Sequence, residues 1–482
     1  MDGLSERPPR VVVVGAGVAG LTTAYRLRSQ HPKMCITVVE AAGRIGGKIL
    51  TERVDGFVIE GGPDSIATFK PQALALTAEL GLAGRLRPAD ESTAGSYVMH
   101  RGRLRRLPDG MNGFVPRRIW PMAKTGLLSP LAKLRMALEY AMPASPHHVD
   151  ETLESFVTRR LGRQVYRRLV EPMARGIFAA DPAQLSLLGT LPHLRAAEAE
   201  HGGLIRAVLA ERRASRSTHS AQPTARRLPS VVAPAAGMSE LVEALGRNLP
   251  NVETLLGSRL VGIDRQGGGY LLHSKPVTGD RSWLPADAVV LAVPAPAAAQ
   301  ALQGLDHGLA ATLRKTRYAS TVTVSMGYRA GDVPNRLKGH GYLVPAQEQR
   351  MARACTWSSS KFPGRAPFGH VLLRASLGGA GRPSLTGLTD EHLISMAQRE
   401  LAASLGITAD PVVHRVHSWT DVMPQYTLGH RDRVAAVERM LSAHPGIILA
   451  GSGYHGLSIP DCIESGQRAA DAVLATLEVQ RT

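Results

Sequence analysis

The chain is poor in aromatic residues and cysteines. Phe, Trp and Tyr make up 4% of the sequence, and its three cysteines, Cys35, Cys355 and Cys462, lie far apart without a C-x-x-C pair. The few aromatic residues argue against binding of single-stranded nucleic acid, which relies on stacking. The cysteine spacing excludes a disulfide framework and favours a reducing, cytoplasmic compartment. We expect Cys462 to be a small buried residue and not a catalytic thiol.

Long apolar runs are missing as well. No stretch reaches about 18 apolar residues, so no membrane-spanning helix is predicted. Residues 1–10 lack the apolar segment of a signal peptide. None of the 17 histidines has a spacing typical of a metal site, His414 and His417 included.

Negative charge is scarce relative to positive charge. The sequence has 57 Lys and Arg against 40 Asp and Glu, a net charge of +17. This excess favours an anionic partner. No zinc spacing or RNP-type aromatic motif accompanies the basic clusters, so no nucleic-acid partner is predicted. A polycarboxylate substrate or an anionic membrane surface suits the charge at least as well.

A dinucleotide-binding signature lies near the N-terminus. An apolar run leads into Gly15-x-Gly17-x-x-Gly20, and a helical pattern and a second strand, Ile36–Val39, end at Glu40. Gly15 permits the tight turn, Gly17 lets the pyrophosphate approach, and Gly20 allows close packing of helix and strand. Glu40 is placed to accept hydrogen bonds from the ribose. The spacing therefore predicts a βαβ unit that binds a dinucleotide.

Two further segments favour FAD over NAD. Residues 43–48, GRIGGK, supply Arg44 as a fork-shaped donor for the pyrophosphate. A second glycine motif at 451–456 has too few residues after it for another nucleotide-binding half. Its continuation, Leu457–Asp461, predicts a helix start instead, with Pro460 in the first turn. Such an N-terminus stabilises negative charge on a reduced flavin, so both ends of the chain are predicted to form one cofactor site.

The middle of the chain shows helical and then strand-like patterns. Residues 122–172 have helical periodicity, and the apolar face is predicted to pack in the core, with a membrane-contacting surface as the open alternative. Strands are predicted at 318–328, 340–345, 353–358 and 371–377, in an antiparallel sheet that carries a substrate cavity. The apolar face consists of Leu127, Leu128, Leu131, Leu134 and Leu138.

These patterns predict an α/β (α+β overall) fold: a Rossmann-type FAD-binding domain, an antiparallel-sheet substrate domain and a helical insertion. The FAD-binding domain is assembled from several stretches of sequence. The predicted divisions are 1–90, 231–300 and 436–482 for the FAD-binding domain, 91–205 for the helical, membrane-binding-like insertion, 206–230 for a flexible basic loop, and 301–435 for the substrate domain.

Five further segments carry a family resemblance. The most diagnostic is Glu171–Ser186, EPMARGIFAADPAQLS, and the others are Gly62–Ser65, Arg101–Pro108, Cys355–Pro367 and Trp419–Tyr426. With the two glycine motifs, they resemble the protoporphyrinogen/coproporphyrinogen oxidases, oxygen-dependent flavoenzymes of haem synthesis, over essentially the whole chain. Amine oxidases and carotenoid desaturases share the two ends but lack the segment at 171–186, and they stay as the alternative.

The resemblance implies a six-electron oxidation of a porphyrinogen to a porphyrin in three two-electron steps, with O2 reduced to H2O2. It implies FAD as cofactor and no catalytic side chain, since flavin N5 takes the hydride. By position, the FAD contacts are Gly15, Ala16, Gly17, Val18, Ala19, Gly20, Glu40, Ala41, Arg44, Lys48, Gly62, Pro63, Asp64, Ser65, Trp419, Leu457, Ser458 and Ile459. The substrate contacts are Lys70, Gly176, which leaves room for the macrocycle, and the apolar clamps Leu343 and Phe362.

The choice between protoporphyrinogen IX and coproporphyrinogen III stays open. Eukaryotic members have an Arg near the position of Ser96, whereas Lys70 resembles the Gram-positive-type branch, which oxidises coproporphyrinogen III. Four propionates suit a more cationic cavity. A peripheral membrane contact and a hand-off of product to the next haem-pathway enzyme are also left open. A non-catalytic binding protein of the same pathway would not need both flavin motifs.

Overall fold

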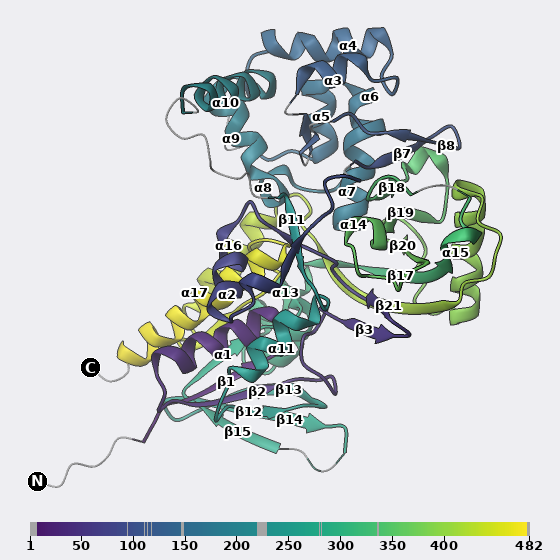
Figure 1. The fold of residues 1–482 in the computed structure, drawn as a ribbon. Helices are drawn as coiled ribbons and strands as arrows, with labels where there is room; N and C mark the ends of the chain where they lie inside the picture. Colours follow the sequence, from purple (N-terminus) through teal and green to yellow (C-terminus); the bar gives the residue numbers. More distant parts are fainter. Residues whose placement is uncertain are drawn as a thin grey trace, which may run out of the picture.

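A computed structural model describes residues 7–93, 95–109, 111–112, 114–116, 118–145, 149–218, 229–278, 280, 282–334 and 337–479. Three parts are visible in Figure 1. A unit with a parallel sheet holds both chain ends, a second sheet lies beside it, and a group of helices lies above them. The predicted fold class, with its Rossmann-type unit, antiparallel sheet and helical insertion, is confirmed.

A parallel sheet forms the centre of the first unit. Its strands lie in the order β12-β2-β1-β16-β22, so segments far apart in sequence are neighbours. The central strands β1 and β16 are nearly continuous apolar runs, as expected where helices cover both faces. Their bounds are β12 Glu253–Leu255, β2 Cys35–Val39, β1 Arg10–Val14, β16 Ala288–Leu291 and β22 Ile447–Leu449.

Helices from the two ends of the chain pack against each other beside this sheet. Helix α1 (Val18–Gln30) lies along α17 (Ile459–Val479). A β-carbon on Gly466 of α17 would lie 2.4 Å from the carbonyl oxygen of Ala19, so the helices approach at backbone distance. The predicted helix after the second glycine motif is thereby confirmed, and it joins the same core as α1.

A seven-stranded sheet forms the second unit. Its order is β21-β17-β20-β19-β18-β7-β8, antiparallel except for the β18–β7 pair. All four predicted strands are present, and α15 (Asp390–Leu405) packs on one face. Strands β7 and β8 come from the stretch assigned to the helical insertion. The bounds are β21 Val413–Gln425, β17 Arg317–Arg329, β20 His370–Gly378, β19 Ala352–Trp357, β18 Gly341–Leu343, β7 Tyr97–His100 and β8 Arg103–Arg106.

The helices of the third part share a core around Phe156 and Leu169. Helix α10 corrects one prediction, because the basic loop expected from residue 206 is helical up to Thr218. Leu204, Ala207 and Val208 are buried, and this spacing anchors one face of the helix. Residues 219–228 lie outside the described residues. The bounds are α3 Ile119–Lys124, α4 Pro130–Ala137, α5 Leu153–Leu161, α7 Glu171–Phe178, α9 Pro192–His201 and α10 Leu204–Thr218.

The apolar face predicted in this region divides into two parts. Leu127 and Leu128 are buried, as predicted, but the prediction of core packing is wrong for the other three residues. Leu131, Leu134 and Leu138, on α4 and the turn after it, are 79%, 61% and 54% exposed. Periodicity identifies an apolar face, but it does not identify what the face contacts.

The remaining elements connect these parts. None of the helices in the described ranges is long and apolar enough to cross a bilayer. The domain boundaries themselves stay a prediction. The other elements are β3 Thr51–Val54, β4 Phe57–Glu60, β5 Ile66–Ala67, α2 Pro71–Glu79, β6 Leu86–Pro88, β9 Met111–Asn112, β10 Val115–Pro116, α6 Arg163–Val165, α8 Leu187–Thr190, β11 Val231–Pro234, α11 Ser239–Arg247, β13 Ser258–Gln266, β14 Gly269–Pro276, β15 Ser282–Ala286, α12 Ala295–Leu302, α13 His307–Arg314, α14 Ser358–Lys361 and α16 His430–Leu441.

Candidate functional site

The first glycine motif leaves an open space at the start of α1. Gly15 has φ +102°, and a β-carbon there would lie 2.5 Å from the carbonyl oxygen of Ala292. Gly20 is equally constrained, since its β-carbon would meet the carbonyl oxygen of Gly15 at 1.9 Å. A β-carbon on Gly17, however, would have no neighbour within 4 Å. The protein itself does not require glycine at this position, whereas a pyrophosphate at the helix N-terminus would.

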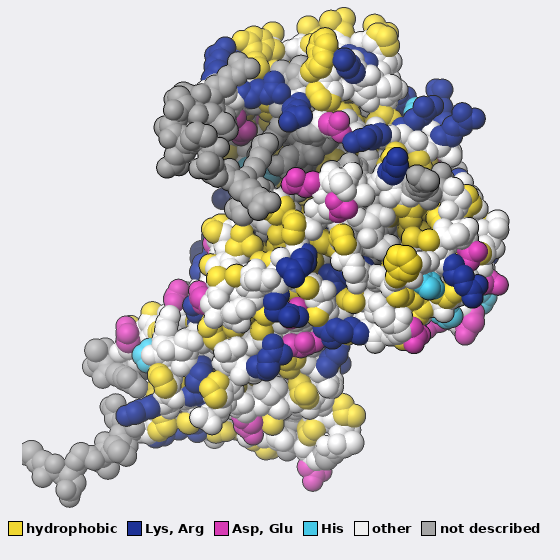
Figure 2. Space-filling model, viewed as in Figure 1, with side chains coloured by type: hydrophobic (Ala, Val, Ile, Leu, Met, Phe, Trp, Pro, Cys, Tyr) yellow, Lys and Arg dark blue, Asp and Glu magenta, His cyan; other side chains and the backbone are white. Residues whose placement is uncertain are grey.

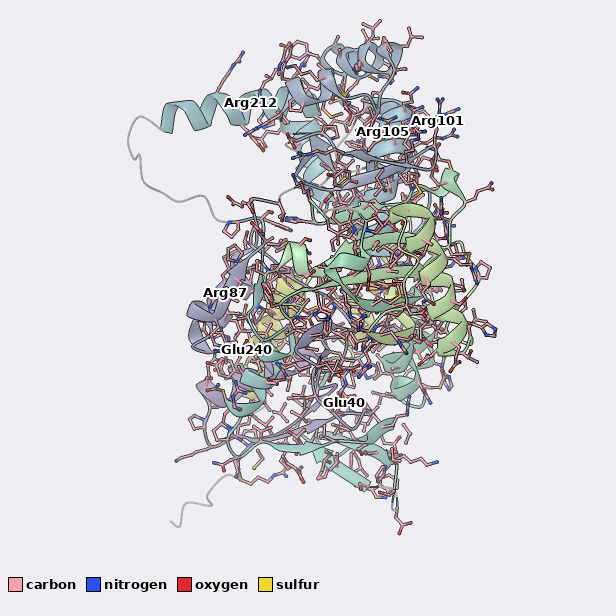
Figure 3. All side chains as sticks on the ribbon, turned by 45° about the vertical axis from the view of Figure 1, so that its right-hand side comes forward. Glu40, Arg87, Arg101, Arg105, Arg212 and Glu240 are labelled. Carbon is pink, nitrogen blue, oxygen red and sulfur yellow. The ribbon has the colours of Figure 1, made fainter. Side chains whose placement is uncertain are left out.

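Glu40 follows β2 at the same edge of the sheet (Figure 3). Its two carboxylate oxygens accept hydrogen bonds from the backbone N–H groups of Ala16 and Ala42, at 2.7 and 2.8 Å. The side chain therefore connects the two turns that a dinucleotide would touch. Each oxygen keeps a second lone pair that can accept a bond from a ribose hydroxyl. Ala41, beside Glu40, is exposed.

Arg44 organises the second glycine-rich loop. Its guanidinium donates to the carbonyl oxygens of Ile45, Gly47 and Ile49 at 3.0, 2.7 and 3.1 Å. The N–H of Gly46 donates to the carbonyl oxygen of Ala16 at 2.7 Å, so the loop lies on the first glycine turn. Arg44 thus holds the loop in place, and its contact with the pyrophosphate stays a prediction.

Lys48 is a half-buried cation at the junction of the two chain ends. Its Nζ lies 3.2 Å from Ser452 Oγ, and burial lowers the pKa of the ammonium group despite the nearby Cys462 thiol. None of the ion pairs found between described residues includes Lys48. A buried cation without an acidic partner is costly unless a ligand compensates it. An anionic cofactor beside Lys48 and the first glycine turn fits this requirement.

The second glycine motif leads into a capped helix N-terminus. Asp461 Oδ2 accepts hydrogen bonds from the backbone N–H and the hydroxyl of Ser458, at 2.9 and 2.6 Å. Leu457, Ser458 and Ile459 therefore lie where α17 begins, as predicted. Burial raises the pKa of Cys462 to about 11, so the thiol stays protonated and acts as a filler.

The segment Gly62–Ser65 joins the cofactor groove to the second unit. A β-carbon on Gly62 would lie 1.8 Å from the carbonyl oxygen of Lys48, so these two loops are in contact. Asp64 receives two bonds from Lys361 Nζ, both 2.9 Å, and one from Ser65 at 2.7 Å. Burial opposes ionisation of Asp64, but Lys361 and Arg374 hold its pKa well below the usual range. Pro63 lies between these anchored residues.

Trp419 and Thr323 attach the seven-stranded sheet to this segment. Trp419 Nε1 and Thr323 Oγ1 both donate to the carbonyl oxygen of Gly61, at 2.8 and 3.0 Å. His417, on the same face of the sheet, lies 2.7 Å from a carboxylate oxygen of Glu52. No cluster of metal-binding side chains occurs among the residues that the structure describes. The face of the sheet on this side is called the inner face below.

Polar residues without partners lie on the inner face. Strand β20 places Arg374 directly opposite Ser325 on β17 and Thr356 on β19. Within the described part of the chain, Ser325 Oγ and Arg374 Nε are buried and lack any hydrogen-bond partner. Because buried polar groups are nearly always paired, these two mark a surface where a ligand is expected.

Helix α7 lies over the other end of the inner face. A β-carbon on Gly176 would lie 2.7 Å from Leu343 Cδ2 and 3.9 Å from Ala354 Cβ. Gly176 therefore lets α7 pack closely on β18 and β19. The structure brings Gly176 and Leu343 together, while Ile177, next on the helix, is 54% exposed. The substrate contacts of Gly176 and Leu343 stay predictions.

Phe362 and Lys70 lie in other surroundings. Phe362 is 3% exposed in the core of the first unit, with the cations of Lys361 and Arg365 at 5.2 and 5.6 Å from its ring. Lys70 forms an ion pair with Asp461, the residue that caps α17. In this structure Phe362 packs as a core residue, and Lys70 connects α2 to the cofactor helix; their substrate roles stay predictions.

Glu171 was missed by the sequence reasoning, although it begins the diagnostic segment. Burial raises the pKa of this carboxyl to about 7, despite the opposing effects of Arg175 and the N–H of Ala346. Arg374 was missed too. A single Arg within the apolar strand HVLLRASLG was the available signal, because alternation places it opposite the buried leucine face.

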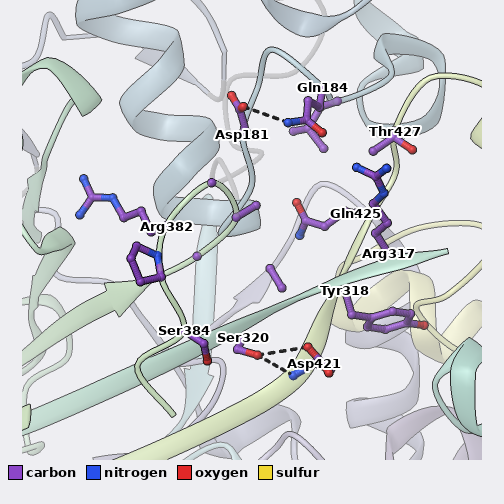
Figure 4. Close-up of a pocket in the computed structure, with 16 residues that line it drawn as sticks. Asp181, Gln184, Arg317, Tyr318, Ser320, Arg382, Ser384, Asp421, Gln425 and Thr427 are labelled. Atoms are coloured by element: carbon purple, nitrogen blue, oxygen red, sulfur yellow. Dashed lines mark hydrogen bonds between the residues drawn. The ribbon is translucent and has the colours of Figure 1, made fainter. Parts of the chain in front are cut away.

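A separate pocket of about 320 Å³ lies at the end of the inner face (Figure 4). Its walls include Asp181 and Gln184 after α7, Tyr318 and Ser320 at the start of β17, and Gln425 at the end of β21. Ser320 and Asp421 are hydrogen-bonded to each other in its wall. None of the residues predicted to contact FAD lines this pocket, so it is distinct from the cofactor groove.

A parallel dinucleotide-binding sheet that faces an antiparallel sheet defines a two-unit flavoprotein. The comparisons agree with this class. Residues 18–474 match the family described as flavin containing amine oxidoreductase, and the chain belongs to it. FAD is accordingly its cofactor, and the fit of the groove rests on Gly17, Glu40 and Lys48.

The chain is similar to several named relatives. It is 33% identical over 480 residues to a coproporphyrinogen III oxidase of Bacillus subtilis (strain 168), covering 98% of this chain and 100% of that protein. It is 30% identical over 484 residues to a chloroplastic protoporphyrinogen oxidase of Nicotiana tabacum, covering 97% and 85%. A solved structure from Exiguobacterium sp. 255-15 has a TM-score of 0.84 and 30% identity, covering 99% and 100%. Cyclohexylamine oxidase from Brevibacterium oxydans IH-35A shares the fold, with a TM-score of 0.66.

Proposed function

We propose that this enzyme oxidises a porphyrinogen of haem biosynthesis to the corresponding porphyrin. The observation that carries the proposal is the inner face, where partnerless polar groups lie between the flavin segments and α7. The similarity to coproporphyrinogen III and protoporphyrinogen oxidases over nearly the whole chain supports the same substrate class. An amine oxidase, the second candidate, shares the fold but has much lower sequence identity.

The residues of this chain hold and orient the reactants. FAD, when bound, accepts hydride from the porphyrinogen and passes the electrons to O2, giving one H2O2 for each two-electron step. Three such steps remove six electrons and six protons from the macrocycle. The chain contributes a groove that excludes water and a sheet face that fixes the ring against the cofactor. No side chain is assigned as an acid or base.

The individual FAD and substrate contacts are part of this proposal. The first glycine turn and Glu40 hold the adenosine end, while Lys48, Asp64, Trp419 and Leu457–Ile459 surround the flavin end. The remaining FAD contacts are those listed by position above. Gly176, Leu343, Lys70 and Phe362 are proposed to contact the macrocycle.

Coproporphyrinogen III is the preferred substrate in this proposal. The charges of Arg374, Arg175 and Arg382 all act on the buried Arg353 near α7, and such a cationic interior suits a substrate with four propionates better than one with two. The test is porphyrin fluorescence in air, with coproporphyrinogen III and protoporphyrinogen IX supplied in parallel to the purified FAD protein. A rise above autoxidation, accompanied by H2O2, supports the proposal, and the kcat/KM ratio fixes the substrate. No rise with either substrate, in protein that retains FAD, overturns it.

We also propose a peripheral contact with an anionic membrane through the helical part. Trp120, Leu131, Leu134, Leu138 and Tyr140 are exposed and form what we call the apolar cap. Figure 2 shows apolar side chains gathered along the top of the molecule, where α4 lies, with Lys and Arg close by. Exposed apolar residues flanked by cations are typical of surfaces that bind anionic lipid.

Vesicle sedimentation tests this contact. The protein is expected to sediment with phosphatidylglycerol vesicles but not with phosphatidylcholine vesicles. Leu131→Glu with Leu134→Glu is expected to abolish sedimentation, while Val277→Glu, at another exposed site, leaves it unchanged. Wild-type protein that stays in the supernatant with both vesicle types overturns the proposal.

A further inference from the structure

Arg374 occupies the centre of the inner face. It lies on β20, opposite Ser325 and Thr356. Leu372, two residues earlier on the same face, packs against Phe57 and Ile59 of β4, the strand that leads to Gly61–Ser65. Because side chains two residues apart share a face, Arg374 points to the same side as Leu372. It therefore lies between the flavin segment and the part of the sheet that α7 covers.

The guanidinium of Arg374 has no partner in the described structure. It forms no hydrogen bond and no ion pair there, and its Nε is buried. The charge of Arg374 helps to lower the pKa of Asp64, but both oxygens of Asp64 are already bound by Lys361. A buried Nε–H without an acceptor is unfavourable, so the folded chain alone does not satisfy this side chain.

The surroundings of Arg374 add positive charge instead of compensating it. Burial, together with the charges of Arg374, Arg175 and Arg382, lowers the pKa of Arg353 to about 9. Among the ion pairs of the described residues, only Arg175 of this group has a carboxylate partner, Glu171. The four guanidiniums therefore form an electropositive interior that an anionic ligand would stabilise.

We propose that Arg374 binds a propionate carboxylate of the porphyrinogen and thereby positions the macrocycle on the inner face. This inference rests on the proposed function, because it assigns a role within the same substrate site. A carboxylate matches the planar fork of a guanidinium and can accept two parallel hydrogen bonds from it. Ser325, directly opposite, has a free hydroxyl that can donate to the same carboxylate.

The variants are Arg374→Met, Arg374→Lys and the control Arg415→Met. Arg415 lies on β21, directly opposite Ser325, and so shares the inner face with Arg374, but its Nε is already bound to Glu52 at 2.8 Å; it therefore tests whether any arginine on this face suffices. Each variant is purified with its FAD, and the flavin spectrum shows that the cofactor site is intact. The steady-state kcat and KM for coproporphyrinogen III are measured in air. Fluorescence titration then gives Kd for coproporphyrin III and for its tetramethyl ester, which lacks the carboxylates.

Arg374→Met is expected to raise KM about 10- to 100-fold, the usual loss for a hydrogen bond between charged groups, with kcat within about threefold. It should bind the free acid and the ester almost equally, whereas the wild type prefers the acid by tenfold or more. Arg374→Lys should recover part of the preference, and Arg415→Met should match the wild type. A merely structural role for Arg374 would not alter the discrimination between acid and ester.

Two failures are distinguishable. If the wild type oxidises coproporphyrinogen III but Arg374→Met keeps the full preference for the acid, the inference is wrong and the proposed function stands. If the wild type neither oxidises a porphyrinogen nor binds a porphyrin, the proposed function itself fails. If Arg374→Met loses FAD, the Arg374→Lys variant tests the inference instead. An Arg374→Lys variant that keeps its flavin spectrum, the wild-type KM and the wild-type preference for the acid would contradict bidentate binding.

Discussion

Two regions of this protein bury arginine, and they treat its charge differently. In the helical part, Arg160 is fully buried, and its Nε donates to Glu139 at 2.8 Å. Arg195 pairs there with Glu198 and Glu151. Arg159 completes a network of three arginines and three glutamates. The charges balance, and each group has a partner.

The interior beneath α7 has no such balance. Arg175, Arg353, Arg374 and Arg382 lie near one another, and of these only Arg175 forms an ion pair in the described structure, with Glu171. The difference separates two uses of a buried cation. A buried cation that stabilises the fold is paired with a carboxylate of the same chain, whereas a cation that binds a ligand is paired only when the ligand is bound.

The largest effect is expected from breaking the balanced network. Glu139→Leu removes the partner of Arg160 and the acceptor of the backbone N–H groups of Leu204 and Ile205. The free energy of unfolding should fall by about 3–5 kcal/mol, because a buried charge loses its partner. Urea denaturation followed by circular dichroism measures this. Glu243→Gln, in the exposed pair with Arg53, is the control and should cost less than about 1 kcal/mol.

The second-largest effect is expected from Glu171, whose contribution to the free energy of unfolding depends on pH. Its pKa of about 7 in the folded chain exceeds the ordinary value of 4.5, so the folded state holds a proton that the unfolded state has lost between these values. Stability from this residue is therefore present below pH 4.5 and is lost as pH rises towards 7. Glu171→Gln should gain about 3 kcal/mol relative to the wild type between pH 5 and pH 8, since one pKa unit is about 1.4 kcal/mol. Equal differences in unfolding free energy at both pH values would contradict this.

A smaller effect is expected for Arg374→Met on stability alone. Because Arg374 has no partner to lose, the free energy of unfolding should change by about 1 kcal/mol or less. Arg160→Met leaves the buried Glu139 without its partner, so the loss in the free energy of unfolding should be several times larger. Comparable losses in the two variants would remove the distinction between the two regions. The measurement is the urea midpoint of both variants at one pH.

The smallest effect on stability is expected at Gly17, where the comparison concerns the room around a residue instead of its charge. Gly17→Ala places a methyl group where the chain has open room, so it should cost about 0.5–1 kcal/mol, mainly because alanine is a poorer N-cap. The FAD content, read from the ratio of flavin to protein absorbance, should nevertheless fall strongly. A variant that keeps stoichiometric FAD would show that the pyrophosphate does not lie against Gly17.

The sequence was sufficient where the determining contacts are local. Gly15, Gly20 and Glu40 lie within one βαβ unit, so spacing alone predicted their arrangement, and Pro460 marked the start of α17. It was insufficient where a partner is distant. Lys70 meets Asp461 across 391 residues, and the surroundings of Arg374 depend on the register of three strands. Helix α10 was missed because a basic, Ser- and Ala-rich composition concealed its apolar positions.

The cofactor groove also has a consequence for how the enzyme is made. Lys48 and Ser452, which meet in the groove, are 404 residues apart. At a translation rate of about 5–20 residues per second, Ser452 is synthesised on the order of 20–80 s after Lys48. During this interval the first glycine turn exists without the helix that completes its site. FAD can therefore be captured only by a chain translated past Ser452, and yellow colour in a preparation reports that translation reached this point and that the two distant segments met.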